Sequence, residues 1–224
     1  LITKIIRAEG DTQSIVFEGK NPIVVINSDT QEYDTKTGVM TATGSVTMFY
    51  KEIETYSNSA QITTDKNGDL KRLVLTGNAR VKQENNESFA DRFVYEAASG
   101  NLTAYGNTTS NAIMDDGSKL VLKSAYQEYN QKRSIFNASG NVRIWYQDYY
   151  AAGPKVTLYS TAGSSKPNEA YFTGRSSITQ GVRTIFADRI KMTMKPKSFD
   201  AQGNTRTVIK NIGSGSDDNM TLGL

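Results

Sequence analysis

Apolar and polar residues alternate along this chain around a glycine that returns again and again. Successive glycines of this kind are 25 to 34 residues apart, so the pattern covers nearly the whole chain. They are Gly19, Gly44, Gly77, Gly106, Gly140, Gly174 and Gly203. A period of about 30 residues is typical of stacked units that cannot bury an apolar face alone. We therefore expect an elongated array with a long surface rather than a single pocket.

The phase of the pattern predicts the type of element. In the second unit, Met40 and Ala42 precede Gly44 by four and two positions, and Val46 and Met48 follow it by two and four. Residues spaced by two share one face of a β-strand, and the intervening threonines and serines face the other way. Each unit thus predicts a half-buried antiparallel strand, with the glycine on its apolar face at a bend or bulge.

A second, less regular strand follows each glycine-centred strand. Examples are Ser28 to Gly38, Phe89 to Gly100 and Phe186 to Pro196, and several of these segments end in Lys-Thr-Gly, Lys-Asn-Gly or Ala-Ser-Gly, which favour turns. Seven two-strand units predict about 14 strands, and no segment keeps helical spacing beyond one or two turns. The expected fold is an all-β sandwich, barrel or roll, in one domain over residues 1–224.

The same phase predicts which side chains line the interior. In the first unit it places Ile15 and Phe17 inward. In the other units the main candidates are Met40, Met48, Leu73, Leu75, Val81, Leu102, Phe136, Val142, Ile144, Phe172, Ile178 and Phe199. The second strands are expected to add Ile62, Phe93, Val156, Leu158, Ile190, Met192 and Met194. For each of these residues, ordinary core packing and the lining of an open slot are both compatible with the pattern.

Composition narrows the chemistry. The 224 residues include no histidine and no cysteine, which removes the usual general base, the commonest transition-metal ligand and any thiolate chemistry. The formal net charge of +3 is far from that of a nucleic-acid-binding protein. No apolar run approaches the roughly 20 residues that span a bilayer. No signal peptide is evident, and the abrupt start at Leu1 indicates a processed or shortened chain.

Paired acids provide the only candidate metal ligands. Asp115-Asp116 and Asp217-Asp218 could in principle bind calcium, but both pairs lie in turn-like contexts without the alternating ligands of a calcium loop. Scattered basic residues such as Arg143 could meet phosphate groups, or could be solvated outward positions. We therefore expect no catalytic residue, no metal and no cofactor.

The repeat resembles a known one. The segment SDTQEYDTKTGVMTATGSVTM (Ser28 to Met48) is similar to the OstA/LptA-type repeat of lipopolysaccharide transport proteins, a family that includes LptA, LptC and the N-terminal domain of LptD. FADRFVYEAASGNLTAYGN (Phe89 to Asn107) and SAYQEYNQKRSIFNASGNVRI (Ser124 to Ile144) look like further copies. The resemblance runs from about Ile15 to Ile209. No membrane anchor is evident, which favours an LptA-like member over LptC.

The resemblance implies a fold, a location and partners. The family forms an elongated, open antiparallel β-jellyroll, a V-shaped slot that shields lipid acyl chains in the periplasm on the way to the outer membrane. The twelve main interior candidates would then be lipid-binding residues. Lipopolysaccharide or a related glycolipid is the implied ligand. Other jellyrolls, joined by strand addition at free edges near Ile15 and Ile209, are the implied partners, with head-to-tail self-association as a further expectation.

Two other classes of protein fit parts of the pattern. A parallel β-solenoid enzyme acting on polysaccharides would need three short strands in each coil and clustered acids, whereas each unit here has two strands and dispersed acids. A repetitive surface or adhesion protein would need no lipid-facing interior. Binding or photo-crosslinking of lipopolysaccharide by the purified protein distinguishes a lipid carrier from both.

Overall fold

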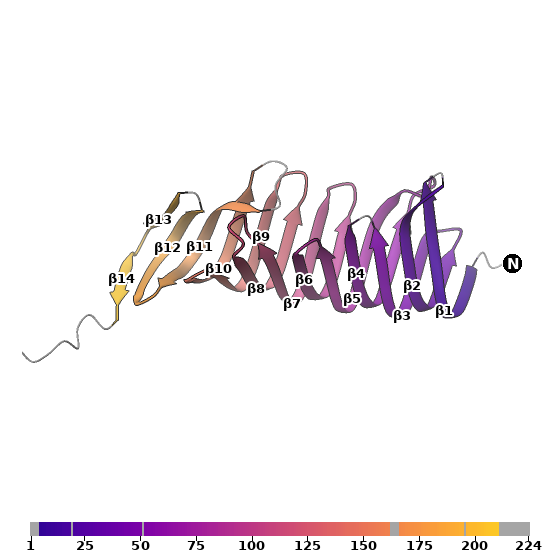
Figure 1. Ribbon diagram of the computed structural model, residues 1–224, viewed down its shortest axis with the longest axis horizontal. Helices are drawn as coiled ribbons and strands as arrows, with labels where there is room; N and C mark the ends of the chain where they lie inside the picture. Colours follow the sequence, from indigo (N-terminus) through magenta and orange to yellow (C-terminus); the bar gives the residue numbers. More distant parts are fainter. Residues whose placement is uncertain (1–4, 19, 51, 162–165, 195, 211–224) are drawn as a thin grey trace, which may run out of the picture.

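The described chain forms a single antiparallel sheet bent along its length. The structure is a computed structural model that describes residues 5–18, 20–50, 52–161, 166–194 and 196–210. Its 14 strands follow one another in sequence order, each paired with its neighbours in the chain, and β14 pairs with β12 beside β13 (Figure 1). The expectation of an open all-β fold with about 14 antiparallel strands is confirmed. The single domain over residues 1–224 stays a prediction, because both ends lie outside the described ranges.

The strands are long and lie across the long axis of the molecule (Figure 1). Their bounds are β1 Ile5–Glu18, β2 Asn21–Asp34, β3 Val39–Tyr50, β4 Ile53–Thr64, β5 Leu70–Gln83, β6 Asn86–Glu96, β7 Asn101–Ile113, β8 Lys119–Asn130, β9 Ile135–Tyr146, β10 Tyr149–Ser160, β11 Pro167–Gln180, β12 Arg183–Met194, β13 Lys197–Gln202 and β14 Arg206–Ile209. Turns between them are short, and Asp34 illustrates their chemistry. Its side-chain oxygen Oδ1 accepts a hydrogen bond from the Lys36 N–H at 2.8 Å, and its carbonyl accepts one from the Gly38 N–H.

A bulge at the recurring glycine bends each odd-numbered strand from β1 to β11. In β3, Gly44 has φ +82° and the next residue also has positive φ. The register with β4 moves from Thr43↔Ser59 to Val46↔Ser57, so two residues of β3 lie opposite one residue of β4. An extra residue of this kind breaks the ladder and bends the strand sharply. Because the bulges of the odd-numbered strands are aligned across the sheet, the sheet bends along one continuous line.

The glycines lie on the outer side of this line, which corrects the prediction that they lie on the apolar face. A Cβ atom built on Gly44 would come within 2.8 Å of the Cβ atom of Asp29, an exposed residue of β2. The equivalent neighbour of Gly140 is Ala125, also exposed, at the same distance. From Gly44 onward, a side chain of the preceding even-numbered strand occupies the space outside each of these glycines, so only a residue without a side chain fits.

The prediction was wrong about the central glycine of the first unit. Gly19 lies outside the described residues, and the first bulge instead falls at Gly10, φ +82°. Ile15 therefore has the opposite phase: it pairs with Val25 and is 42% exposed, whereas the neighbouring pair places Ile26 in the core at 2%. The first strand begins at Ile5, ten residues before the predicted edge, and Phe17 on that strand is 56% exposed.

With Gly10 as the first centre, the repeat has a higher order. Gly10 and Gly44 lie 96 residues before Gly106 and Gly140, and Gly77 lies 97 residues before Gly174. A shift of 96 residues aligns β3 with β9 and β4 with β10 without a gap, and a shift of 97 matches FADRF in β6 with FADRI in β12. The chain therefore contains two copies of a three-unit block. Corresponding positions in the two halves can be compared residue by residue.

Candidate functional site: the interior of the bent sheet

The bend divides the sheet into two walls that face each other. Wall A contains the part of each odd-numbered strand that follows its glycine and the part of each even-numbered strand that precedes the bend. Wall B contains the remaining part of each strand. In each wall, residues paired across successive strands form rows that run the length of the molecule. The three inward rows described below carry no charged side chain, and Lys197, paired with the buried Met194, lies in a further row at the margin. An uncharged interior of this length is suited to apolar ligands.

Three inward rows define the interior, and each can be followed through the strand pairing. The wall A row is Ser14, Ile26, Met48, Thr55, Val81, Ser88, Ser110, Leu122, Ile144, Ala151, Ile178, Ile185 and Thr207. The wall B row nearer the bend is Ala8, Gln31, Ala42, Ala60, Leu75, Phe93, Ala104, Gln127, Ala138, Val156, Phe172, Ile190 and Ala201. The outer wall B row is Ile6, Tyr33, Met40, Ile62, Leu73, Tyr95, Leu102, Tyr129, Phe136, Leu158, Ala170, Met192 and Phe199.

All twelve main interior candidates point inward, as the pattern predicts. Eleven lie in the three rows, and Val142, which is fully buried, lies beside the bend. Five of the twelve are only half-buried: Met40, Val81, Leu102, Phe136 and Phe199. The candidates on the second strands are also buried, from Val156 at 0% to Ile62 at 9% exposure. Whether any of them contacts lipid stays a prediction.

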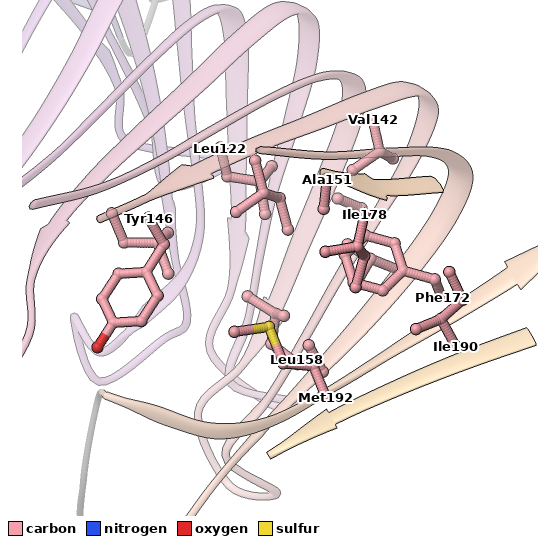
Figure 2. Close-up of a cluster of buried hydrophobic side chains, with 14 of the residues drawn as sticks. Leu122, Val142, Tyr146, Ala151, Leu158, Phe172, Ile178, Ile190 and Met192 are labelled. Atoms are coloured by element: carbon pink, nitrogen blue, oxygen red, sulfur yellow. The ribbon is translucent and has the colours of Figure 1, made fainter. Parts of the chain in front are cut away.

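The two walls pack against each other through two apolar clusters. One cluster lies in the first half of the chain, from Ile26 to Ala104, and the other runs from Met114 to Met194. Figure 2 shows the second, in which Leu122 and Ile178 of wall A and Phe172 and Met192 belong to the same group of buried side chains.

The interior of the second cluster is nearly filled. Its cavity, lined among others by Ile144, Leu158 and Phe172, measures about 20 Å³. A space of that size holds one water molecule but no acyl chain. The sheet itself is open, as expected, since β1 pairs with neither β13 nor β14.

A hydrogen-bonded polar belt separates the two clusters. Gln127 of wall B is 3% exposed, accepts a hydrogen bond from the Ser110 hydroxyl at 2.6 Å and donates to the Leu122 carbonyl at 3.4 Å. Beside it, the Thr108 hydroxyl donates to the Ser124 carbonyl at 2.8 Å. The belt crosses the bend from one wall to the other. It therefore divides the interior into two apolar compartments.

The same belt recurs at the start of the first block. Gln31 accepts a hydrogen bond from the Ser14 hydroxyl and donates to the Ile26 carbonyl at 3.1 Å, and Thr12 donates to the Ser28 carbonyl at 2.8 Å. These residues lie 96 positions before their counterparts in the second belt. The alternation of apolar and polar residues did not predict them, because it assigns only apolar residues to the interior. The signal available was the repetition itself, Gly-x-Thr-x-Ser in β1 and β7.

The charged groups lie on the outer surface and in turns. Asp116, in the β7–β8 turn, accepts hydrogen bonds from the Ser118 side chain and N–H, the Tyr146 hydroxyl and the Gln147 amide, which lower the pKa of this carboxyl to about 2. Asp115 pairs with Lys166 at 3.0 Å. Asp217 and Asp218 lie outside the described residues. Within the described ranges no group of three acids could hold a metal ion, and no helix is long and apolar enough to cross a membrane.

Cations on the outer face stack on aromatic rings. The Arg80 guanidinium lies 5.2 Å from the centre of the Tyr56 ring and 5.8 Å from that of Phe89, and it pairs with Glu87. Burial and the Glu128 carboxylate raise the pKa of Tyr126 to about 12, so its hydroxyl stays protonated. These contacts join partly exposed side chains on the outer face.

Comparison with known proteins agrees with the geometry. Residues 25–164, which are 140 of the 224, match the family model described as "LptA/(LptD N-terminal domain) LPS transport protein". No curated protein matches the chain. Among solved structures, the chain is similar to LptH from Pseudomonas aeruginosa, described as the LptA homologous periplasmic component of the lipopolysaccharide transport device. The identity is 11%, with 84% of this chain and 95% of that chain covered and a TM-score of 0.26. At that score the similarity adds nothing to the assignment, which rests on the family model.

Proposed function

Because the chain belongs to the LptA/LptD N-terminal domain family of lipopolysaccharide transport proteins, we propose that it carries lipopolysaccharide by shielding the acyl chains between walls A and B. Members of this family are transport proteins rather than enzymes, which sets aside the polysaccharide-active and adhesion alternatives. The observation that carries the proposal is the interior itself. Its rows are uncharged and mostly apolar across successive strands from β1 to β13.

The dimensions and energetics support a carrier. Strands in a sheet lie about 4.8 Å apart, so the interior extends roughly 60 Å along the array. Each methylene removed from water is stabilised by about 0.8 kcal/mol, and a lipid with several acyl chains needs that stabilisation along its whole path. Methionines such as Met40, Met48 and Met192 add adaptable side chains to the lining. A continuous apolar path of this length supports passage of a lipid through the periplasm to the outer membrane.

The topology supports entry of lipid from the side. Every strand pairs only with strands next to it in the chain or, for β14, with β12. The free margins of walls A and B are therefore joined by side-chain contacts and not by backbone hydrogen bonds. Separating the walls breaks no ladder; it costs the apolar contacts, which acyl chains then replace, and a few polar contacts such as those of Ser110 with Gln127 and of Asp115 with Lys166.

The edges of the sheet support an end-to-end bridge. The outer edge of β1 has no partner among the described strands, and unpaired edges favour strand addition. Large apolar side chains are exposed on β1: Ile5, Ile6, Ile15, Val16 and Phe17. We propose that other jellyrolls, or a second copy of this chain, cover this edge and that β13 and β14 form the opposite contact. The setting would be the periplasm, which lipopolysaccharide must cross on its way to the outer membrane.

Site-specific photo-crosslinking tests the carrier function. A photoreactive residue at Leu75, Phe136 or Phe172 is expected to capture lipopolysaccharide, because all three face inward. The matched outward positions are Thr43 and Thr47, where capture should be at background. Equal labelling of inward and outward positions would refute the assignment of the interior as the lipid path.

A further inference from the structure

Two buried hydroxyl groups on strand β4 have no hydrogen-bond partner. The Oγ1 atom of Thr55 and the Oγ atom of Ser57 are shielded from solvent, in residues that are 3% and 7% exposed. Among the described residues, these two are the buried side-chain atoms left without a partner. A buried hydroxyl that gives up water without gaining a partner destabilises the fold. Native structures rarely keep such groups without a reason.

Both hydroxyls face the first apolar compartment. Thr55 lies in the wall A row between Met48 of β3 and Val81 of β5, and Ser57 pairs with Val46. Val46 and Val81 have no polar side-chain atom, and the sulfur of Met48 is only a weak acceptor that makes no hydrogen bond with Thr55. Further along the row, two strands from Thr55, the hydroxyls of Ser88 and Ser110 are 2.8 Å apart. The compartment thus has unpaired polar groups on one wall, beside the belt that closes it.

Other buried polar side chains of the interior are paired, so the lack of a partner is particular to β4. Thr12 and Ser28 bond to each other, as do Thr108 and Ser124, and the two glutamines are held by serines and carbonyls. The fold has no need of hydroxyls at the β4 positions. In the second block the corresponding residues, 96 positions later, are Ala151 and Gly153.

We propose that Thr55 and Ser57 form a binding position for a hydroxyl group carried on an acyl chain, which makes the first compartment selective for hydroxylated acyl chains. A hydroxyl can accept a hydrogen bond from one residue and donate one to the other, whereas a carbonyl can only accept. The second compartment, with Ala151 and Gly153, accepts plain hydrocarbon. The inference rests on the proposed carrier function and adds a preference among lipid chains.

The test compares two ligands that differ by one hydroxyl. Isothermal titration calorimetry of the full chain gives dissociation constants for tetradecanoate and for 3-hydroxytetradecanoate. The wild type is expected to bind the hydroxylated chain about 2- to 10-fold more tightly, the factor that one net hydrogen bond supplies. In the double variant Thr55→Val, Ser57→Ala this ratio should fall to about 1.

A matched control removes a hydroxyl that cannot meet the ligand. Thr41→Val changes an exposed, outward-facing residue of β3 and should leave the wild-type preference intact. Equal affinities in the wild type, or a preference that survives in the double variant, overturn this inference and leave the carrier function standing. If neither ligand binds the wild type, the carrier function fails and this inference fails with it. Equal affinities in the wild type overturn the inference whether or not the double variant folds.

Discussion

Gly44 offers the sharpest test of how the sheet is folded into two walls. Replacing it with alanine adds one methyl group at a residue with φ +82°, and that methyl would lie 2.8 Å from Asp29 Cβ and closer still to its carboxylate. The left-handed conformation costs alanine about 1–2 kcal/mol. Rotation of the Asp29 side chain cannot move its Cβ atom, so the backbone of β2 or β3 must shift. Overpacking of this kind costs a further 1–3 kcal/mol or so.

Gly68 is a matched control for the backbone term. It has φ +90° in the turn between β4 and β5, and a Cβ atom there would meet nothing within 4 Å. Gly68→Ala should therefore lower the free energy of unfolding by only about 1–2 kcal/mol. The difference between the two variants isolates the contact with Asp29.

Urea unfolding followed by far-ultraviolet circular dichroism measures both variants and completes a double-mutant cycle with Asp29→Gly. In the Asp29→Gly background, Gly44→Ala should cost no more than Gly68→Ala, because the space outside the glycine is then empty. If Gly44→Ala is as mild as Gly68→Ala in the wild-type background, the glycines serve only for their φ angles. That result would refute a steric role for the Asp29 side chain at the corner.

Three further predictions concern the core, pH and assembly. Phe172→Ala should lower the free energy of unfolding by about 3–5 kcal/mol, since Phe172 is 2% exposed, whereas Phe49→Ala at a 38% exposed position should cost far less in the same urea titration. The pKa of Asp116 is lowered from 3.8 to about 2 in the folded state, so its stabilisation is complete above pH 4 and disappears as the pH falls towards 2; Asp116→Asn should lower the thermal midpoint at pH 7 but not at pH 2. Ile209→Pro should weaken concentration-dependent self-association seen by light scattering without destabilising the monomer, and a wild type that stays monomeric at every concentration would contradict the self-association half of the bridge proposal.

The position of that proline follows from the hydrogen bonding of β14. The Lys210 N–H donates to the Val182 carbonyl at 3.0 Å, and antiparallel pairs alternate between bonded and non-bonded. The N–H group of Ile209 therefore points away from β12, towards an added strand, and that of Val208 points into the sheet. Val208→Pro should damage the last hairpin itself, which distinguishes loss of assembly from loss of folding.

The alternation of apolar and polar residues was enough to predict the fold class, the strand number and the inward face of most strands. Each of these follows from a period of two that a half-buried strand must show, as around Gly44 and Gly77. The first unit failed because β1 is an edge strand, where Ile15 can be apolar and exposed without a core behind it. Hydrophobicity alone therefore identified Gly19 instead of Gly10 as the centre of the first unit.

The polar interior could not be predicted from that alternation. Gln127 and Gln31 read as outward residues, and only the three-dimensional bend brings them to serine hydroxyls and backbone carbonyls that satisfy them. Thr55 and Ser57 read as ordinary strand residues for the same reason. These two residues are distinguished only by the lack of a hydrogen-bond partner within reach, and a sequence does not show distances. The contact of the walls with each other was equally hidden, since it depends on how far the sheet bends.

Pairing only between neighbours has a consequence for the evolution of length. Removing or inserting one hairpin, two strands or about 10 Å of array, leaves the register of all other strands unchanged. The interior rows simply become shorter or longer, with the same cross-section. The match between the two 96-residue blocks indicates that the chain has already grown in this way. A wider or narrower periplasm would therefore need only a different number of hairpins, and the side chains that line the lipid path would stay the same.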